Sequence, residues 1–258
     1  EALPLAERHP EGNGQVYRIL GALGTAYREE SQFERAQELL ENSLRLAESA
    51  RDYGEMATSY NSLGTLYVKL GDANRAVEAY KRSLACLEKK GSELQTAQVY
   101  NNLGTVYANQ RDWQQAEQQY QRSLEISRAG GDTCAQAKTL NNLTQIYQVL
   151  DQPEKAVKVC QQAIALFKEL RDFKNAALAQ RNLGRYYRAT KQPELARLAF
   201  EEAMPLFLLG KDEVESAATR RDLQGLTGKV RLPWWAWAGL IIACGLIAVL
   251  VWLIISEL

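Results

Sequence analysis

The sequence predicts an all-α fold, a solenoid of stacked helical hairpins followed by one transmembrane helix. Two observations support this prediction. Apolar and small residues recur every 40 positions along most of the 258-residue chain, and residues 234–255 contain no charged side chain. Hairpins that cannot bury their apolar faces alone can do so by stacking on neighbours, and repetition at a fixed period is the sequence signature of such an array.

The repeat is visible as columns of identical or similar residues, and five successive steps need no gap or insertion. The leucine column is Leu23, Leu63, Leu103, Leu143, Leu183 and Leu223, and the tyrosine column is Tyr27, Tyr67, Tyr107, Tyr147 and Tyr187. Two alanine columns are Ala36, Ala76, Ala116, Ala156 and Ala196, and Ala57, Ala97, Ala137, Ala177 and Ala217. A column of mostly large side chains is Leu40, Tyr80, Tyr120, Cys160 and Phe200. This regularity predicts structurally equivalent units.

Each unit is expected to contain two amphipathic helices. In residues 53–90, one apolar stripe includes Leu63 and a second includes Tyr80, each with the three- and four-residue spacing of a helical face. Gly71 is expected to end the first helix, and Asp72 is a suitable N-cap for the second.

Two departures from the pattern have structural consequences. Thr144 replaces the glycine that the second, third and fifth units carry directly after the repeated leucine, which predicts looser packing of the fourth hairpin. Pro205 falls inside the second helix of the fifth unit, where proline is expected to kink or shorten a helix.

These units resemble the tetratricopeptide repeat. The residues that carry the resemblance are Leu63, Gly64 and Tyr67 in the first helix and Ala76, Tyr80 and Ser83 in the second. The usual repeat has about 34 residues, so 40 implies longer helices, as in the subclass of kinesin light chains and spindle-orientation adaptors. The resemblance implies a right-handed α-solenoid of five repeats plus a capping helix.

The expected domain organisation follows the repeat register. Residues 1–13 are the end of a truncated preceding repeat and a loop, because residues 2–7 parallel residues 43–48, so a larger protein is expected to continue upstream. The solenoid covers residues 14–226, with repeats at 14–52, 53–92, 93–132, 133–172 and 173–212 and a capping helix at 213–226. A linker at 227–233, a transmembrane helix at 234–255 and a short tail at 256–258 complete the chain.

The uncharged segment 234–255 has the properties of a membrane span. A helix of this length rises about 33 Å, and a bilayer core is about 30 Å thick. Tryptophans suited to the membrane interfaces lie near its two ends: Trp234, Trp235, Trp237 and Trp252. Lys229 and Arg231 precede the segment and predict a single-pass protein with the repeats on the cytoplasmic side. The alternative, a buried helix of the solenoid, is disfavoured because the segment has no polar face.

The family resemblance also predicts a binding groove, because the first helix of each repeat lines the concave surface. The expected peptide-binding residues are Asn61, Asn101, Asn102, Asn141, Asn142, Arg181, Asn182, Arg185 and Arg188. An asparagine amide offers an acceptor and two donors, so a row of amides can hold an extended peptide backbone. The arginines would favour acidic or phosphorylated residues. Alternatively, the asparagines bond to neighbouring helices or water, and both interpretations stay open.

Composition narrows the functional classes. The formal net charge is zero, which argues against a nucleic-acid partner. The four cysteines form no CxxC pair and are expected to be buried thiols in a reducing compartment, and His9 is the only histidine. No phosphate-binding loop, catalytic triad or metal-ligand cluster is visible, so no catalytic residue, metal or cofactor is expected.

The leading hypothesis is therefore a membrane-anchored scaffold or adaptor, not an enzyme, that binds a protein or extended peptide in its groove. The expected partners also include the lipid bilayer. A second copy contacted through the transmembrane helix is a further candidate, since Gly239 and Ala243 have suitable spacing, but chance explains so short a match better in an alanine-rich segment. The alternative is the C-terminal sensor and transmembrane effector of a larger signalling or defence protein, such as a repeat-bearing NTPase, that acts by oligomerising at the membrane.

Overall fold

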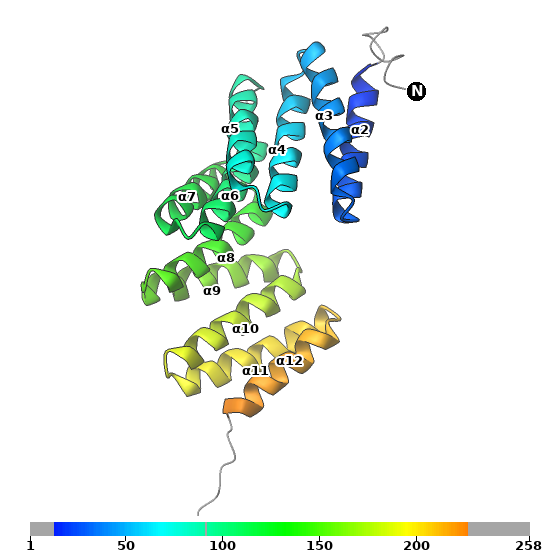
Figure 1. Cartoon of the computed structure of the whole chain (residues 1–258). Coiled ribbons are helices and arrows are strands. Elements are labelled where there is room, and N and C mark those ends of the chain that lie inside the picture. The colour runs from blue at the N-terminus through cyan, green and yellow to red at the C-terminus, as the bar shows by residue number, and fades with distance from the viewer. Residues whose placement is uncertain (1–12, 91, 227–258) are drawn as a thin grey trace, which may run out of the picture.

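The computed structural model describes residues 13–90 and 92–226, which form eleven helices in a curved stack (Figure 1). The first helices of the five hairpins are α2 (Asn13–Glu29), α4 (Tyr53–Lys69), α6 (Glu93–Asn109), α8 (Thr133–Val149) and α10 (Phe173–Ala189). The second helices are α3 (Phe33–Ser49), α5 (Ala73–Lys90), α7 (Trp113–Ala129), α9 (Pro153–Glu169) and α11 (Pro193–Leu209). The last described helix, α12 (Glu213–Leu226), packs on α11 and α10. The predicted all-α solenoid is thus confirmed.

The two helices of a hairpin approach closely because a glycine faces a large ring. A methyl group added at Gly104 would lie 2.6 Å from the Tyr120 ring, and one added at Gly184 would lie 2.7 Å from the Phe200 ring. The repeated alanine at the start of each second helix, from Ala36 to Ala196, is almost completely buried in all five hairpins. Small residues at these two positions therefore set the distance between the helices.

The fourth hairpin carries different residues at the glycine position and the ring position. Thr144 stands in the glycine position and Cys160 in the ring position, and their exposed fractions are 4% and 1%. The Cys160 thiol also donates to the Ala179 carbonyl oxygen at 3.7 Å. Thr144 and Cys160 also border a cavity of about 420 Å³ between α8 and α10, and the looser packing of this hairpin stays a prediction.

The turns between helices repeat as well. Apart from the turn at residue 91, which the structure does not describe, each contains a residue with a left-handed backbone, such as Gly71 with φ of +77°, and most of these residues are not glycine. An aspartate then caps several of the helices; Asp52, for example, accepts hydrogen bonds from the backbone N–H groups of Gly54 and Glu55. Pro205 does not shorten α11, which has 17 residues, as most of the other hairpin helices do.

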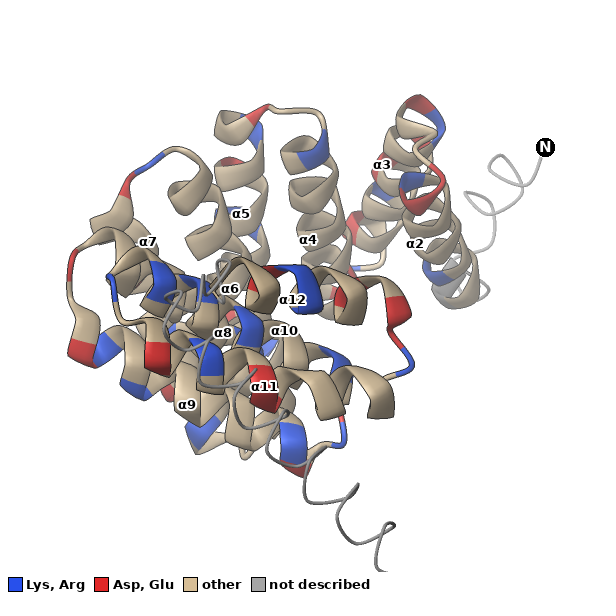
Figure 2. Ribbon diagram, turned by 90° about the horizontal axis from the view of Figure 1, so that it is seen from below, with Lys and Arg blue, Asp and Glu red and all other residues tan. Residues whose placement is uncertain are grey.

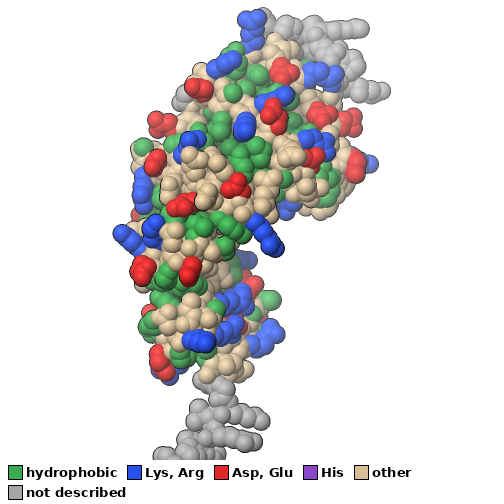
Figure 3. Space-filling view, turned by 60° about the vertical axis from the view of Figure 1, so that its left-hand side comes forward, with side chains coloured by type: hydrophobic (Ala, Val, Ile, Leu, Met, Phe, Trp, Pro, Cys, Tyr) green, Lys and Arg blue, Asp and Glu red, His purple; other side chains and the backbone are tan. Residues whose placement is uncertain are grey.

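Charged side chains of both signs are interspersed with apolar ones over the face of the array shown in Figure 3. The predicted partial repeat and loop at residues 1–13, apart from Asn13, and the predicted transmembrane helix at 234–255 lie outside the described residues. Among helices within residues 13–90 and 92–226, none has the length and apolar character needed to cross a bilayer.

The first testable prediction concerns the pair of facing residues in the fourth hairpin, where Thr144 and Cys160 occupy the positions of Gly104 and Tyr120. Cys160→Tyr should lower stability by about 1–3 kcal/mol, because the ring would collide with Thr144. Adding Thr144→Gly should restore much of the loss by recreating the pair seen at Gly104 and Tyr120. Urea unfolding of the two single variants and the double variant measures the coupling, and strictly additive effects would contradict this packing account.

Candidate functional site

The first helices of the middle hairpins enclose an open groove. One cavity of about 220 Å³ lies between α4 and α6, and another of about 370 Å³ lies between α6 and α8. Gln95 and Gln98 of α6 line both cavities, so the two are neighbours separated by these side chains. We call this surface the amide groove; its polar lining comprises Thr58, Asn61, Gln95, Gln98, Asn101, Asn102, Lys138 and Thr139.

Asparagines of successive helices bond to each other beneath this groove. The Asn102 amide nitrogen donates to the Asn61 side-chain oxygen at 2.9 Å, and the Asn142 amide nitrogen donates to the Asn101 side-chain oxygen at 3.0 Å. All four side chains are half-buried. Because each amide has one acceptor and two donors, these bonds leave further hydrogen-bonding capacity on every member. The sequence left open whether the amides link helices or bind a partner, and this geometry allows both.

The amide pairing does not extend to the next pair of helices. Asn141 of α8 and Asn182 of α10 occupy the equivalent positions, but the described residues contain no side-chain hydrogen bond between them. Both instead line a separate cavity of about 420 Å³, together with Arg185. Side-chain hydrogen bonds therefore join the predicted row of amides between α4 and α6 and between α6 and α8. Among the described residues, no such bond joins α8 to α10.

The predicted basic end of the groove is already occupied by carboxylates of α12. Arg181 is only 7% exposed and forms a close ion pair with Glu215. Arg185 and Arg188 both pair with Asp222, at 2.8 Å and 3.0 Å. Figure 2 shows α12 crossing the lower end of the array over α10. These arginines therefore hold the last helix in place, and Arg185 also lines the cavity between α8 and α10.

We call the ion pairs that join α10 to Glu215 and Asp222 of α12 the clasp. The pKa of Asp222 is consistent with these ion pairs. Partial burial acts to raise the pKa of Asp222, but the hydrogen bonds and charges of Arg185 and Arg188 outweigh it and hold the pKa below its usual value. A carboxylate with a lowered pKa in the folded state stabilises the fold above its unfolded pKa, and loses that contribution as the pH falls through the folded pKa. The clasp is thus fully formed at neutral pH.

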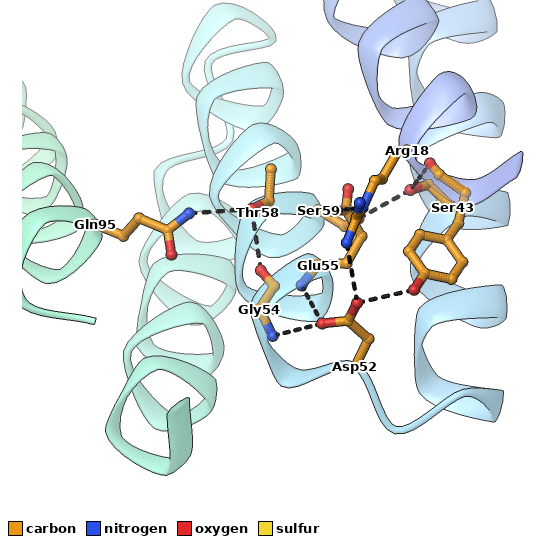
Figure 4. A network of polar contacts seen from close by, with 9 residues as sticks. Arg18, Ser43, Asp52, Gly54, Glu55, Thr58, Ser59 and Gln95 are labelled. Atoms are coloured by element: carbon orange, nitrogen blue, oxygen red, sulfur yellow. Dashed lines mark hydrogen bonds and ion pairs between the residues drawn. The ribbon is translucent and has the colours of Figure 1, made fainter. Parts of the chain in front are cut away.

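A second polar network fixes α2 against the start of α4 (Figure 4). The Tyr17 hydroxyl donates to the Asp52 carboxylate at 2.8 Å, and the same carboxylate caps α4. Arg18 lies 3.8 Å from Glu55. Asp52 thereby ties the first hairpin to the second at one edge of the groove.

Sequence reasoning missed several groove residues. Gln98 and Lys138 line the larger cavity, and each stands four residues before a predicted asparagine, Asn102 or Asn142. Residues four apart on a helix share a face, so this spacing was the available signal. Gln95 also reaches across the groove, where its amide nitrogen lies 3.5 Å from the Thr58 hydroxyl.

The cysteines differ in accessibility. Cys86 and Cys160 are buried free thiols, and burial raises the pKa of Cys160 to about 11. Cys134 is exposed and lines the cavity between α6 and α8, in contrast to the expected burial. Within the described part of the chain, no cluster of three or more histidine, cysteine or acidic residues could hold a metal ion.

Comparison with known proteins identifies the repeat. The family model described as tetratricopeptide repeat matches residues 15–89, 95–169 and 135–208. Among solved structures, BtubC from P. vanneervenii superposes with a TM-score of 0.68 at 22% identity, covering 81% of this chain and 91% of that chain. TPR-like repeats from a predicted kinesin light chain of Podosopora anserina give a TM-score of 0.62 at 21% identity, covering 77% and 96%.

A third similar structure is a signal transduction ATPase with a tetratricopeptide repeat sensor from Pyrococcus horikoshii. Its TM-score is 0.66 at 20% identity, and the match covers 89% of this chain but only 38% of the ATPase. At these identities the structures establish a shared fold. A search of curated proteins finds no match to the chain.

The clasp at α12 is testable by hydrogen exchange. Asp222→Ala removes the shared carboxylate, and partly exposed ion pairs contribute about 0.2–1 kcal/mol each. Amides of α12 should therefore exchange several-fold faster at neutral pH, while those of α6 keep their rates. Arg220→Ala is the matched control, since Arg220 forms none of the ion pairs found among the described residues. Equal α12 exchange in both variants would show that the clasp does not hold the helix.

Proposed function

Because the chain belongs to the tetratricopeptide repeat family, we propose that it is a scaffold that binds an extended segment of a partner protein in the amide groove. The observation that carries this proposal is the pair of neighbouring cavities along α4, α6 and α8, lined by amides with unused donors and acceptors. An extended peptide presents N–H and C=O groups that such amides can pair. We infer a binding protein and not an enzyme.

The amide pairs pre-organise this surface. Asn61 and Asn101 use their side-chain oxygens to accept bonds from the next helix, so their amide nitrogens remain available to a partner carbonyl. Side chains at the rim, among them Lys138 and Leu94, would select for sequence. A preference for acidic residues at the α10 end would have to compete with Asp222 for Arg185 and Arg188.

Two substitutions distinguish peptide binding by the asparagine amides from a role of these amides in the fold alone. Asn61→Asp and Asn101→Asp keep the oxygens that accept from Asn102 and Asn142 but remove the free amide donors. We expect the double variant to bind a peptide selected from a random library on the wild-type chain about tenfold or more weakly, with an unchanged unfolding midpoint.

The matched control places the same charge outside the groove. Asn74→Asp with Gln114→Glu alters exposed positions on the second helices α5 and α7. Affinity should be preserved in this control. If the groove variant binds as tightly as the control, the amide donors do not contact the partner.

We further propose that residues 234–255 anchor the scaffold in a membrane with the repeats on the cytoplasmic side. The support is the uncharged 22-residue segment with tryptophans near both ends and Lys229 and Arg231 before it. The groove would then lie close to the bilayer, which raises the effective concentration of membrane-bound partners.

Liposome flotation of the full chain tests the anchor. Leu246→Arg places a charge near the centre of the segment at a cost of about 2.5–3.5 kcal/mol, so flotation and resistance to alkaline extraction should fall strongly. Leu198→Arg on the exposed face of α11 is the control and should float as the wild type does. Flotation that is absent in the wild-type chain would rule out the anchor.

A second candidate function is a sensor and transmembrane effector within a larger signalling protein. The similarity to the Pyrococcus horikoshii ATPase with a tetratricopeptide repeat sensor favours it, although the match covers only 38% of that protein. In this case ligand binding in the groove would control oligomerisation at the membrane. Sequencing the complete gene tests this directly, because a start codon within one repeat upstream would exclude an attached ATPase domain.

A further inference from the structure

The last described helix, α12, keeps the register of a first helix but has no second helix packed on it among the described residues. Its Ala217 is exposed, whereas the equivalent alanines Ala57, Ala97, Ala137 and Ala177 have exposed fractions of 2%, 0%, 0% and 0%. In a complete hairpin the second helix covers this alanine. The Ser83 hydroxyl of α5, for example, donates to the Ala57 carbonyl oxygen at 2.8 Å.

The surface that a second helix would cover is hollow, and its lining combines apolar side chains with the charged Lys211, Asp212, Glu213 and Arg220. A cavity of about 450 Å³ is lined by residues that include Phe207 and Leu208 of α11 and Ala217 of α12. Leu208 and Leu209 are 68% and 60% exposed, and Val214 is 76% exposed. Grouped apolar side chains of this size usually mark a surface that another segment covers.

The sequence beyond α12 continues the 40-residue register into the apolar segment. Pro233 follows Pro153 and Pro193, which begin the second helices α9 and α11. Ala236 extends the column from Ala36 to Ala196, and Leu240 extends the column of Leu40, Tyr80, Tyr120, Cys160 and Phe200. Ala243 extends the column of Ser43, Ser83, Ser123, Ala163 and Ala203, all of which have an exposed fraction of 0%.

From this register and the open surface, we propose that residues 233–249 dock on α11 and α12 as the second helix of a sixth hairpin. The chain length suits this arrangement, because Pro233 stands 20 residues after Glu213, the first residue of α12, as Pro193 stands 20 residues after Phe173. The solenoid thereby covers one face of the apolar segment in the absence of a bilayer. The inference uses the same segment as the proposed anchor but requires neither insertion nor peptide binding.

The docked helix is held less tightly than its counterparts, for two reasons. Gln224 stands in the position of Gly64, Gly104 and Gly184, so the side chain at Leu240 cannot approach as Tyr120 approaches Gly104. The outward face is also uncharged, whereas the exposed face of α5 carries Glu78, Lys81 and Arg82. A bilayer can cover the whole helix and therefore competes with the solenoid for the segment.

Disulfide trapping in the full chain tests the docking. The background Cys134→Ser with Cys244→Ser removes the exposed thiol and the one beside the test position. Ala217→Cys with Ala243→Cys reproduces the contact made by Ala57 and Ser83. The control pairs Ala217→Cys with Gly245→Cys, because the equivalent residues Arg45, Ala85, Glu125, Ala165 and Pro205 are all exposed.

The chain is synthesised in a lipid-free translation system at low concentration, and disulfides are identified by mass spectrometry of the monomer. The 217–243 pair should form an intramolecular disulfide at least tenfold faster than the 217–245 pair, and added phosphatidylcholine vesicles should slow it several-fold. Equal rates for the two pairs, or disulfides found only in dimers, would overturn the proposal. If the 217–243 disulfide forms but the full chain does not float with liposomes, the docking is supported and the membrane anchor is rejected.

Discussion

The close approach of two helices within each hairpin is the constraint on which the rest of the structure depends. Where a glycine of the first helix faces an aromatic ring of the second, as at Gly104 and Tyr120, even one added methyl group would collide. The first hairpin keeps the glycine, Gly24, and places Leu40 opposite it, whereas in the fourth hairpin both members differ, as Thr144 and Cys160. Each hairpin packs on the next, as α3 does on α4 and α7 on α8, so that the hairpins form one curved stack (Figure 1).

That alignment explains why the same asparagines can serve both the fold and a partner. The columns that pack inside a hairpin are nearly invariant along the chain, while those beside them vary from Gly21 and Ala22 to Arg181 and Asn182. Where two amides meet across successive helices, one bond joins the helices and the remaining groups face the groove. The bond also restrains the side chains, which would lower the entropy lost on binding of the proposed peptide.

At the C-terminal end, ion pairs between α10 and α12 take the place of amide pairs between first helices. Arg181, Arg185 and Arg188 meet Glu215 and Asp222 of α12, so positive charge that would otherwise face the groove is balanced within the chain. The same helix presents an exposed Ala217 on its other side.

The sequence by itself determined the solenoid, the helix pairs and the columns that pack, because a 40-residue period with helical spacing has few structural solutions. It also indicated the asparagine positions but missed Gln98 and Lys138, whose role depends on the neighbouring helix. Only the tertiary structure decided which amides pair and that the arginines are clasped by α12. Those contacts join residues 34–41 positions apart, and their partners depend on how successive hairpins are offset, which side-chain spacing within one helix does not specify.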